Sequence, residues 1–140
     1  MANTYYKFDY ENAGAPADLI IPEGVTEISD SAFYGCTSLQ SVTMPESLTK
    51  IGDDAFRDCT SLQSVTIPEG VTEIGDRAFL GCSSLRTVTL LNPKIKIERS
   101  AFTGCTGITI VNLPKGITWH NVKNKFKDSP WGQNKPKESK

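Results

Sequence analysis

The sequence of 140 residues is poor in the side chains that most active sites need. It contains one histidine, His120, and no recognisable nucleophile motif. It also has no run approaching the roughly 20 apolar residues of a membrane-spanning helix. Met1 to Tyr5 show neither the charged nor the apolar region of a signal peptide. These gaps predict a protein that is not an enzyme, needs no cofactor and does not insert into a membrane, and they assign no compartment.

Arginine is missing from the C-terminal end, although that end is basic. Residues 115–140 carry seven lysines and two acidic residues, whereas residues 1–114 carry 14 acidic and 8 basic residues, a net charge of −6. A nucleic-acid interface usually has a clustered basic face with arginines that reach base edges. We therefore expect no nucleic-acid partner, and we expect residues 133–140 to be a solvated, disordered tail.

What the sequence has is a repeat of 23 residues, in five columns that keep the same step. Each column holds one residue type or two closely related ones. Random substitution at each position would not keep five columns at the same 23-residue step. The repeat predicts a solenoid in which equivalent residues stack. The columns are Ile28, Ile51, Ile74 and Ile97; Ala32, Ala55, Ala78 and Ala101; Phe33, Phe56, Phe79 and Phe102; Cys36, Cys59, Cys82 and Cys105; and Leu39, Leu62, Leu85 and Ile108.

Each unit predicts two extended segments and a turn. The alternation of Leu39, Val42 and Met44 indicates a short strand, which Pro45 ends because it has no backbone donor. A second extended segment ends at Ile51. Aspartates then cap a helical turn that carries the Ala-Phe pair, at Asp30, Asp53 and Asp76. Two residues after each phenylalanine comes a residue type that tolerates a left-handed turn, at Gly35, Asp58, Gly81 and Gly104.

The ends of the chain depart from this pattern. The alternating aromatic residues from Tyr5 to Tyr10 predict a strand that caps the core. In the fourth unit Leu91 replaces the proline and Lys94 occupies an inward position, so we expect Ile95 to turn inward in its place. The predicted organisation is a cap strand and loop over 1–18, a solenoid of four repeats and a partial fifth over 19–117, a degenerate cap with Trp119, Phe126 and Trp131 over 118–132, and the tail over 133–140.

The four cysteines are the residues most suggestive of chemistry. Stacked side chains point the same way at a spacing of about 4.8 Å, whereas zinc needs four ligands that converge on one point. Parallel Cβ directions also disfavour disulfides between neighbouring coils. We therefore predict free, buried thiols and no metal site. A catalytic pairing of His120 with Asp128 and Ser129 would need precise geometry in the least regular part of the chain, and we expect none.

The repeat motif resembles that of a known family. The pattern that Leu39, Val42, Met44, Pro45, Leu48, Ile51, Ala55, Phe56 and Cys59 form looks like the bacterial leucine-rich repeat of the BspA type, also called the Treponema pallidum type. The resemblance covers about residues 19–117. It implies a right-handed α/β solenoid with a parallel sheet of about five short strands on one face and short helical turns or strands on the other. It further implies a binding role, often in cell-surface proteins of host-associated bacteria, and no catalytic residues.

If this resemblance holds, the binding surface is the outward side of the parallel strands. Five strands span roughly 24 Å, and a standard interface buries about 800 Å² per partner, so we expect weak or edge-assisted binding. The other interpretation is that these are ordinary solvent-facing strand residues. The candidate partner-binding residues are Ser41, Thr43, Ser64, Thr66, Thr87, Thr89 and Asn112, with Ile110 beside them and Gln40, Gln63 and Arg86 at the edge.

Two charged columns complete the pattern. Glu27, Lys50, Glu73 and Lys96 alternate in sign, which favours the stacking register. Glu23, Glu46 and Glu69 instead stack like charges, which is tolerated if the row stays solvated or meets a basic partner.

Two functions therefore follow from the sequence. The first is a non-enzymatic protein-binding module, adhesin-like and acting at a bacterial surface, that binds a host or bacterial protein. The alternative is a structural spacer or self-assembly element of a larger repeat protein, which light scattering would reveal as oligomers.

Overall fold

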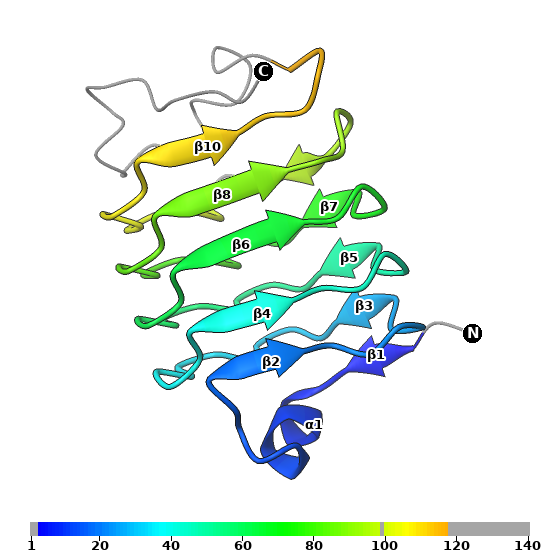
Figure 1. The fold of residues 1–140 in the computed structure, drawn as a ribbon, viewed down its shortest axis with the longest axis vertical. Coiled ribbons are helices and arrows are strands. Elements are labelled where there is room, and N and C mark those ends of the chain that lie inside the picture. Colours follow the sequence, from blue (N-terminus) through cyan, green and yellow to red (C-terminus); the bar gives the residue numbers. More distant parts are fainter. Residues whose placement is uncertain (1–2, 99, 118–140) are drawn as a thin grey trace.

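The computed structural model describes residues 3–98 and 100–117 as a stack of coils flanked by two parallel sheets (Figure 1). The long-strand sheet holds β2 (Asp18–Ile20), β4 (Ser41–Thr43), β6 (Ser64–Ile67), β8 (Thr87–Leu90) and β10 (Ile110–Asn112). The short-strand sheet holds β1 (Thr4–Tyr5), β3 (Glu27–Ile28), β5 (Lys50–Ile51), β7 (Glu73–Ile74) and β9 (Lys96–Ile97). The predicted solenoid with a parallel sheet of five short strands is thereby confirmed. The segments that carry the Phe residues are turns with little helix.

Pairing in both sheets keeps the 23-residue step of the sequence. Ile28 pairs with Ile51, and Ile51 with Ile74. The alternating charges stack as predicted, since Lys50 lies between Glu27 and Glu73 in the same register. Parallel strands cannot be joined by a tight hairpin turn. The chain must therefore run around the coil, through the Phe-bearing turns, before the next strand can pair with the previous one.

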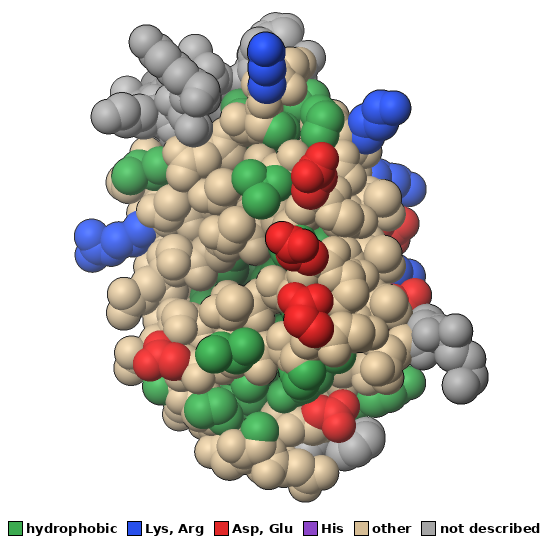
Figure 2. All heavy atoms as spheres, turned by 45° about the vertical axis from the view of Figure 1, so that its right-hand side comes forward, with side chains coloured by type: hydrophobic (Ala, Val, Ile, Leu, Met, Phe, Trp, Pro, Cys, Tyr) green, Lys and Arg blue, Asp and Glu red, His purple; other side chains and the backbone are tan. Residues whose placement is uncertain are grey.

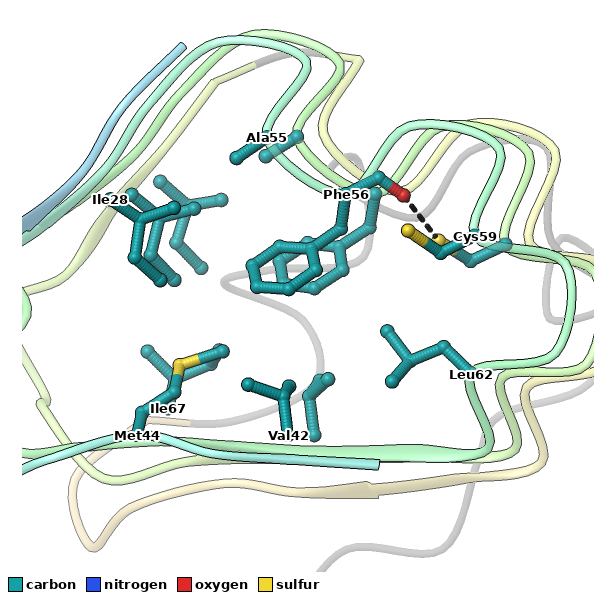
Figure 3. Packing of buried hydrophobic residues seen from close by; sticks show 14 of the residues in the cluster. Ile28, Val42, Met44, Ala55, Phe56, Cys59, Leu62 and Ile67 are labelled. Carbon is teal, nitrogen blue, oxygen red and sulfur yellow. Dashed lines mark hydrogen bonds between the residues drawn. The ribbon is translucent and has the colours of Figure 1, made fainter. Parts of the chain in front are cut away.

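The core is a ladder of identical side chains between the two sheets. Phe33, Phe56, Phe79 and Phe102 are fully buried. Their ring centroids lie 4.8, 5.0 and 5.1 Å apart with interplanar angles of at most 9°. Figure 3 shows Phe56 overlapping the next ring, with Ala55 beside it and Val42 and Leu62 on the opposite wall. The rise of each coil is therefore about 5 Å, close to the strand spacing of a sheet.

The N-terminal segment corrects one prediction. The strand predicted from Tyr5 to Tyr10 is wrong beyond Tyr5, because helix α1 (Lys7–Asn12) follows β1. The Asp9 carboxylate accepts the Tyr6 amide at 2.7 Å, which satisfies a backbone donor at the start of the helix. The Tyr5 and Tyr10 rings still cover the end of the core, at 5.7 and 5.2 Å from Phe33.

The cap also belongs to the repeat. Tyr5 pairs with Ile28, which lies 23 residues later, and Tyr10 packs against Phe33 at the same step. Period-2 alternation of aromatic residues resembled a strand, but Tyr5 and Tyr10 in fact occupy the positions of the core residues Ile28 and Phe33 one coil earlier, whereas Tyr6 is exposed. The predicted caps and tail over 118–132 and 133–140 lie outside the described residues.

The turns confirm one prediction and revise another. Gly35, Asp58, Gly81 and Gly104 have φ values of 58 to 77°, as the left-handed turn requires. In the described coils, the Asp30 and Asp53 carboxylates do not cap a helical turn of their own coil. Instead, Asp30 accepts the amide of Asp53 at 2.8 Å, and Asp53 accepts the amide of Asp76 at 2.9 Å. These two bonds therefore tie three successive coils together.

The irregular fourth unit is accommodated at the surface. Lys94 is exposed, and Ile95 packs against the core while remaining partly exposed, as predicted. The Asn92 amide donates to the Val71 carbonyl at 2.9 Å, and its oxygen accepts the Lys94 amide at 2.8 Å. These bonds hold the altered turn in place of the proline that the other units carry.

Candidate functional site

The outward residues of the long-strand sheet form two columns. The first runs through Asp18, Ser41, Ser64, Thr87 and Ile110, and the second through Ile20, Thr43, Thr66, Thr89 and Asn112. The structure thus brings together all seven candidate residues of the strand face on one surface. It adds Asp18 and Ile20 of β2, which the sequence did not single out, and Ile20 is 74% exposed.

Hydrogen bonds distinguish the ends of this face from its middle. Ser41 donates to the Asp18 carboxylate at 2.7 Å, and the Asn112 amide donates to Thr89 at 3.0 Å. Within the described ranges, the hydroxyls of Thr43, Ser64 and Thr66 have no side-chain hydrogen bond. The centre of the face therefore offers three hydroxyl groups to solvent or to a partner.

The long-strand sheet is interrupted between β4 and β6. These strands pair only through Ser41 and Ser64, whereas β6 and β8 pair through four residues each. A depression of about 380 Å³ lies there, with Val42 and Met44 among its lining residues. A second depression, of about 430 Å³, shares three lining residues with the first. We call this continuous hollow the turn-edge groove, and its shared residues are Glu46, Pro68 and Leu91.

The groove was missed from the sequence, yet two departures from the repeat mark it. Met44 stands where the other coils carry Ile or Leu, and Leu91 stands where they carry Pro. Leu91 is 45% exposed, whereas Val42 and Met44 remain buried, with 8% and 9% of their surface exposed. The exposed apolar surface of the groove therefore comes mainly from Leu91, in the irregular coil.

One side of the groove is acidic. Glu23, Glu46 and Glu69 are exposed and occupy equivalent positions in three successive coils. Figure 2 shows acidic side chains one above another along this side of the molecule, with hydrophobic atoms next to them. Ion pairs in the described residues involve neither Glu46 nor Glu69. The positive charges that would neutralise this row are thus not supplied by the described coils.

The cysteines are free, as predicted, and three of them are buried. Each buried thiol donates to the carbonyl of the phenylalanine in the preceding coil at 3.0 Å, from Cys59 to Phe33, Cys82 to Phe56 and Cys105 to Phe79. Figure 3 shows the thiols of successive coils pointing the same way. Cys36 differs from the prediction because it is only half-buried. No group of three potential metal ligands occurs among residues 3–98 and 100–117.

The Cys59 and Cys82 thiols stay protonated at neutral pH. Burial raises the pKa of Cys59 to about 12, and the neighbouring Cys105 thiol together with burial raises the pKa of Cys82. The thiolate is the reactive form of cysteine, so neither residue is a nucleophile at neutral pH. The cysteine column acts as packing, with a weak hydrogen bond from each buried thiol to the preceding coil.

A pH dependence of stability follows from the Cys59 pKa. The folded value of about 12 lies above the ordinary value near 9, so the stabilisation is complete below pH 9 and is lost as the pH rises toward 12. We expect the free energy of unfolding to fall by about 1.4 kcal/mol per pH unit from this thiol between pH 9 and 11. Urea denaturation at several pH values measures the slope. Cys59→Val, which has no ionisable group, should show a correspondingly flatter slope, and equal slopes would contradict the assignment.

Comparisons with known proteins agree with this geometry. The family model described as BspA type leucine rich repeat region matches residues 5–129 in six copies. This match extends the repeat into the N-terminal cap, where the structure also places it. A search of curated proteins found no match. No helix in the described part of the chain has the length and apolar character needed to cross a membrane.

Three solved structures share the fold. A leucine-rich repeat protein from Bacteroides ovatus ATCC 8483 is 32% identical, with a TM-score of 0.64, and the match covers 83% of this chain and 30% of that one. The T. pallidum leucine-rich repeat protein is 27% identical, with a TM-score of 0.60 and coverages of 75% and 62%. A leucine-rich cell surface protein from Faecalibacterium prausnitzii A2-165 is 26% identical, with a TM-score of 0.62 and coverages of 81% and 37%.

The chain thus spans less than a third of the Bacteroides protein and less than two thirds of the other two. The 23-residue register, the stacked Phe and Cys columns and the family match over residues 5–129 together show that this chain belongs to the BspA-type leucine-rich repeat family.

Proposed function

We propose that this chain is a non-enzymatic protein-binding module that uses the outward face of the long-strand sheet and the adjoining turn-edge groove. The observation that carries the proposal is the middle of this face. There, Thr43, Ser64 and Thr66 present hydroxyls without side-chain partners in the described chain, beside an apolar hollow. Polar groups around an apolar depression are the usual composition of a recognition surface.

The size of the face sets the expected strength of binding. Five strands at about 5 Å provide a narrow surface, below the 800 Å² or so of a standard interface. A single module of this size binds weakly, and repetition along a longer protein would raise its avidity without new contacts. The three structural relatives are longer than the matched region, which supports this use of the fold.

A role at a bacterial surface belongs to the same proposal. The Faecalibacterium relative is described as a cell surface protein. The partner is then a host or bacterial protein that meets the exposed face, and the module acts in adhesion.

The experiment compares two triple-lysine variants on an array of purified serum, extracellular-matrix and bacterial surface proteins. The face variant carries Thr43→Lys, Ser64→Lys and Thr66→Lys. The control carries Thr60→Lys, Ser83→Lys and Thr106→Lys, which lie in exposed turns that precede the long strands. We expect the unmodified protein and the control to bind at least one array protein with micromolar affinity, and the face variant to bind it at least ~10-fold more weakly. If the unmodified protein binds no array protein more strongly than the face variant does, the proposal is excluded.

A further inference from the structure

We propose that the turn-edge groove takes an extended peptide segment of a partner protein, in which apolar side chains alternate with lysine or arginine. This inference rests on the proposed function and names the chemistry of its partner. It depends on three observations: the opening between β4 and β6, the apolar surface inside it, and the acidic row along its side.

The opening is the first observation. Elsewhere the long-strand sheet is closed by three or four paired residues per strand, but β4 and β6 share one pair. Thr43 of β4 and Thr66 of β6 are not a paired position, unlike Thr66 and Thr89. Thr43 and Thr66 both line the depression of about 380 Å³, which has room for one or two medium-sized side chains.

The surface inside is apolar where a partner would enter. Val42 and Met44 contribute to the lining only the 8% and 9% of their surface that is exposed, and most of the apolar surface comes from Leu91 in the neighbouring irregular coil. Leu91 lines both depressions, so the apolar surface continues to the turns. An aliphatic side chain inserted here would remove apolar area from water on both molecules.

The charge selects a basic occupant. Glu46 and Glu69 line the same hollow, and Glu23 stands in the next coil of the row. Successive coils rise by about 5 Å, as the Phe stack shows, so the row spans about 10 Å. Like charges at this spacing repel one another, and a cation between them would relieve the repulsion. In an extended peptide, alternate side chains lie about 6.8 Å apart on one face, so two basic residues match the length of the row.

This arrangement favours a peptide of mixed character over a purely basic or a purely apolar one. Basic side chains on one face of the strand would meet the glutamates, and apolar side chains on the other would meet Met44 and Leu91. Exposed ion pairs are individually weak, so the apolar contact must supply part of the affinity.

The test uses a fluorescein-labelled six-residue peptide that alternates lysine and leucine, with binding to the full chain followed by fluorescence polarisation. Two matched peptides replace all lysines by glutamate or all leucines by serine. The protein variants are Glu46→Gln with Glu69→Gln, which removes the row's charge, and Leu91→Ser, which removes exposed apolar surface. Glu11→Gln, in α1, removes one exposed charge far from the groove and serves as the control.

We expect the lysine and leucine peptide to bind the unmodified protein and the Glu11→Gln variant equally. Its affinity should fall roughly 10-fold in the double glutamine variant and roughly 5-fold in Leu91→Ser. Binding should weaken as salt rises from 50 to 500 mM, but only when Glu46 and Glu69 are present. Both matched peptides should bind at least several-fold more weakly.

Equal affinity of all protein variants for the lysine and leucine peptide would overturn the inference. So would light scattering that shows dimers dissolved by the double glutamine substitution, because the occupant would then be a second copy of this chain. The two proposals fail in different ways. If array proteins bind the unmodified protein but not the face variant, while the lysine and leucine peptide does not bind at all, the binding-module proposal stands. Only the proposed basic occupant of the groove is then rejected.

Discussion

Replacing Phe56 by alanine should lower the free energy of unfolding by about 3 to 5 kcal/mol. Its ring is fully buried and is stacked between Phe33 and Phe79, at 4.8 and 5.0 Å from their centroids. The backbone around it cannot collapse into the space. The Phe56 amide donates to Ala78, and its carbonyl accepts the Cys82 thiol, so both ends are held by the next coil.

Urea denaturation followed by circular dichroism measures this loss, and Thr60→Ala in the exposed part of the same turn is the control. The control should change stability by less than about 0.5 kcal/mol. In a solenoid each coil is stabilised by its two neighbours, so loss of a central ring weakens two interfaces at once. A loss below 1 kcal/mol for Phe56→Ala would show that the Phe column does not hold the coils together.

The second large effect is expected for Gly75→Ala, at about 3 kcal/mol, the upper end of the usual range for overpacking. A Cβ at this position would lie 2.5 Å from an Asp53 carboxylate oxygen, and 2.7 Å from both the Asp53 amide nitrogen and the Gly52 carbonyl carbon. Two of these three atoms belong to the backbone of the preceding coil. They can move away only if the coils separate, which would weaken the bond from the Asp76 amide to Asp53.

Ser29→Ala is the matched control, because Ser29 occupies the same column two coils earlier and already carries a Cβ. Thermal and urea unfolding of both variants should show a large loss for Gly75→Ala and almost none for Ser29→Ala. Equal stability of the two variants would mean that the coils yield more easily than the spacing of the ladder indicates.

Much of the fold was predictable because the repeat shows directly which residues of neighbouring coils pair. Residues 23 apart had to lie next to each other once the coils stacked, so the Ile28 column, the Phe ladder and the alternating charges of Glu27 and Lys50 were correct. The parallel thiols followed from the same argument, and the structure adds the carbonyl to which each buried thiol donates.

Predictions based on local pattern alone were less successful. The aromatic alternation after Tyr5 suggested a strand, but tertiary packing on Phe33 and the Asp9 bond to the Tyr6 amide favour a helix. Asp53 looked like a helix cap, yet its carboxylate accepts the Asp76 amide of the next coil. In both cases a contact with the coil 23 residues away contributed what the local pattern did not show.

The candidate site divides in the same way. The strand face, including Ser64 and Thr66, was predictable because side chains alternate along a strand whose inward residues are known. The turn-edge groove was not, since it arises where Met44 and Leu91, two unrelated departures from the repeat, line one hollow. Neither residue alone signals a cavity.

The sequence alone specifies which residues of this protein face inward and which residue stacks on which, because a strict period leaves one register that buries every apolar column. Only the tertiary structure decides where that register opens, as it does between β4 and β6, and which glycines have no room for a side chain, as at Gly75. Both depend on the distances between the backbones of successive coils, and the periodicity of the residues does not report those distances.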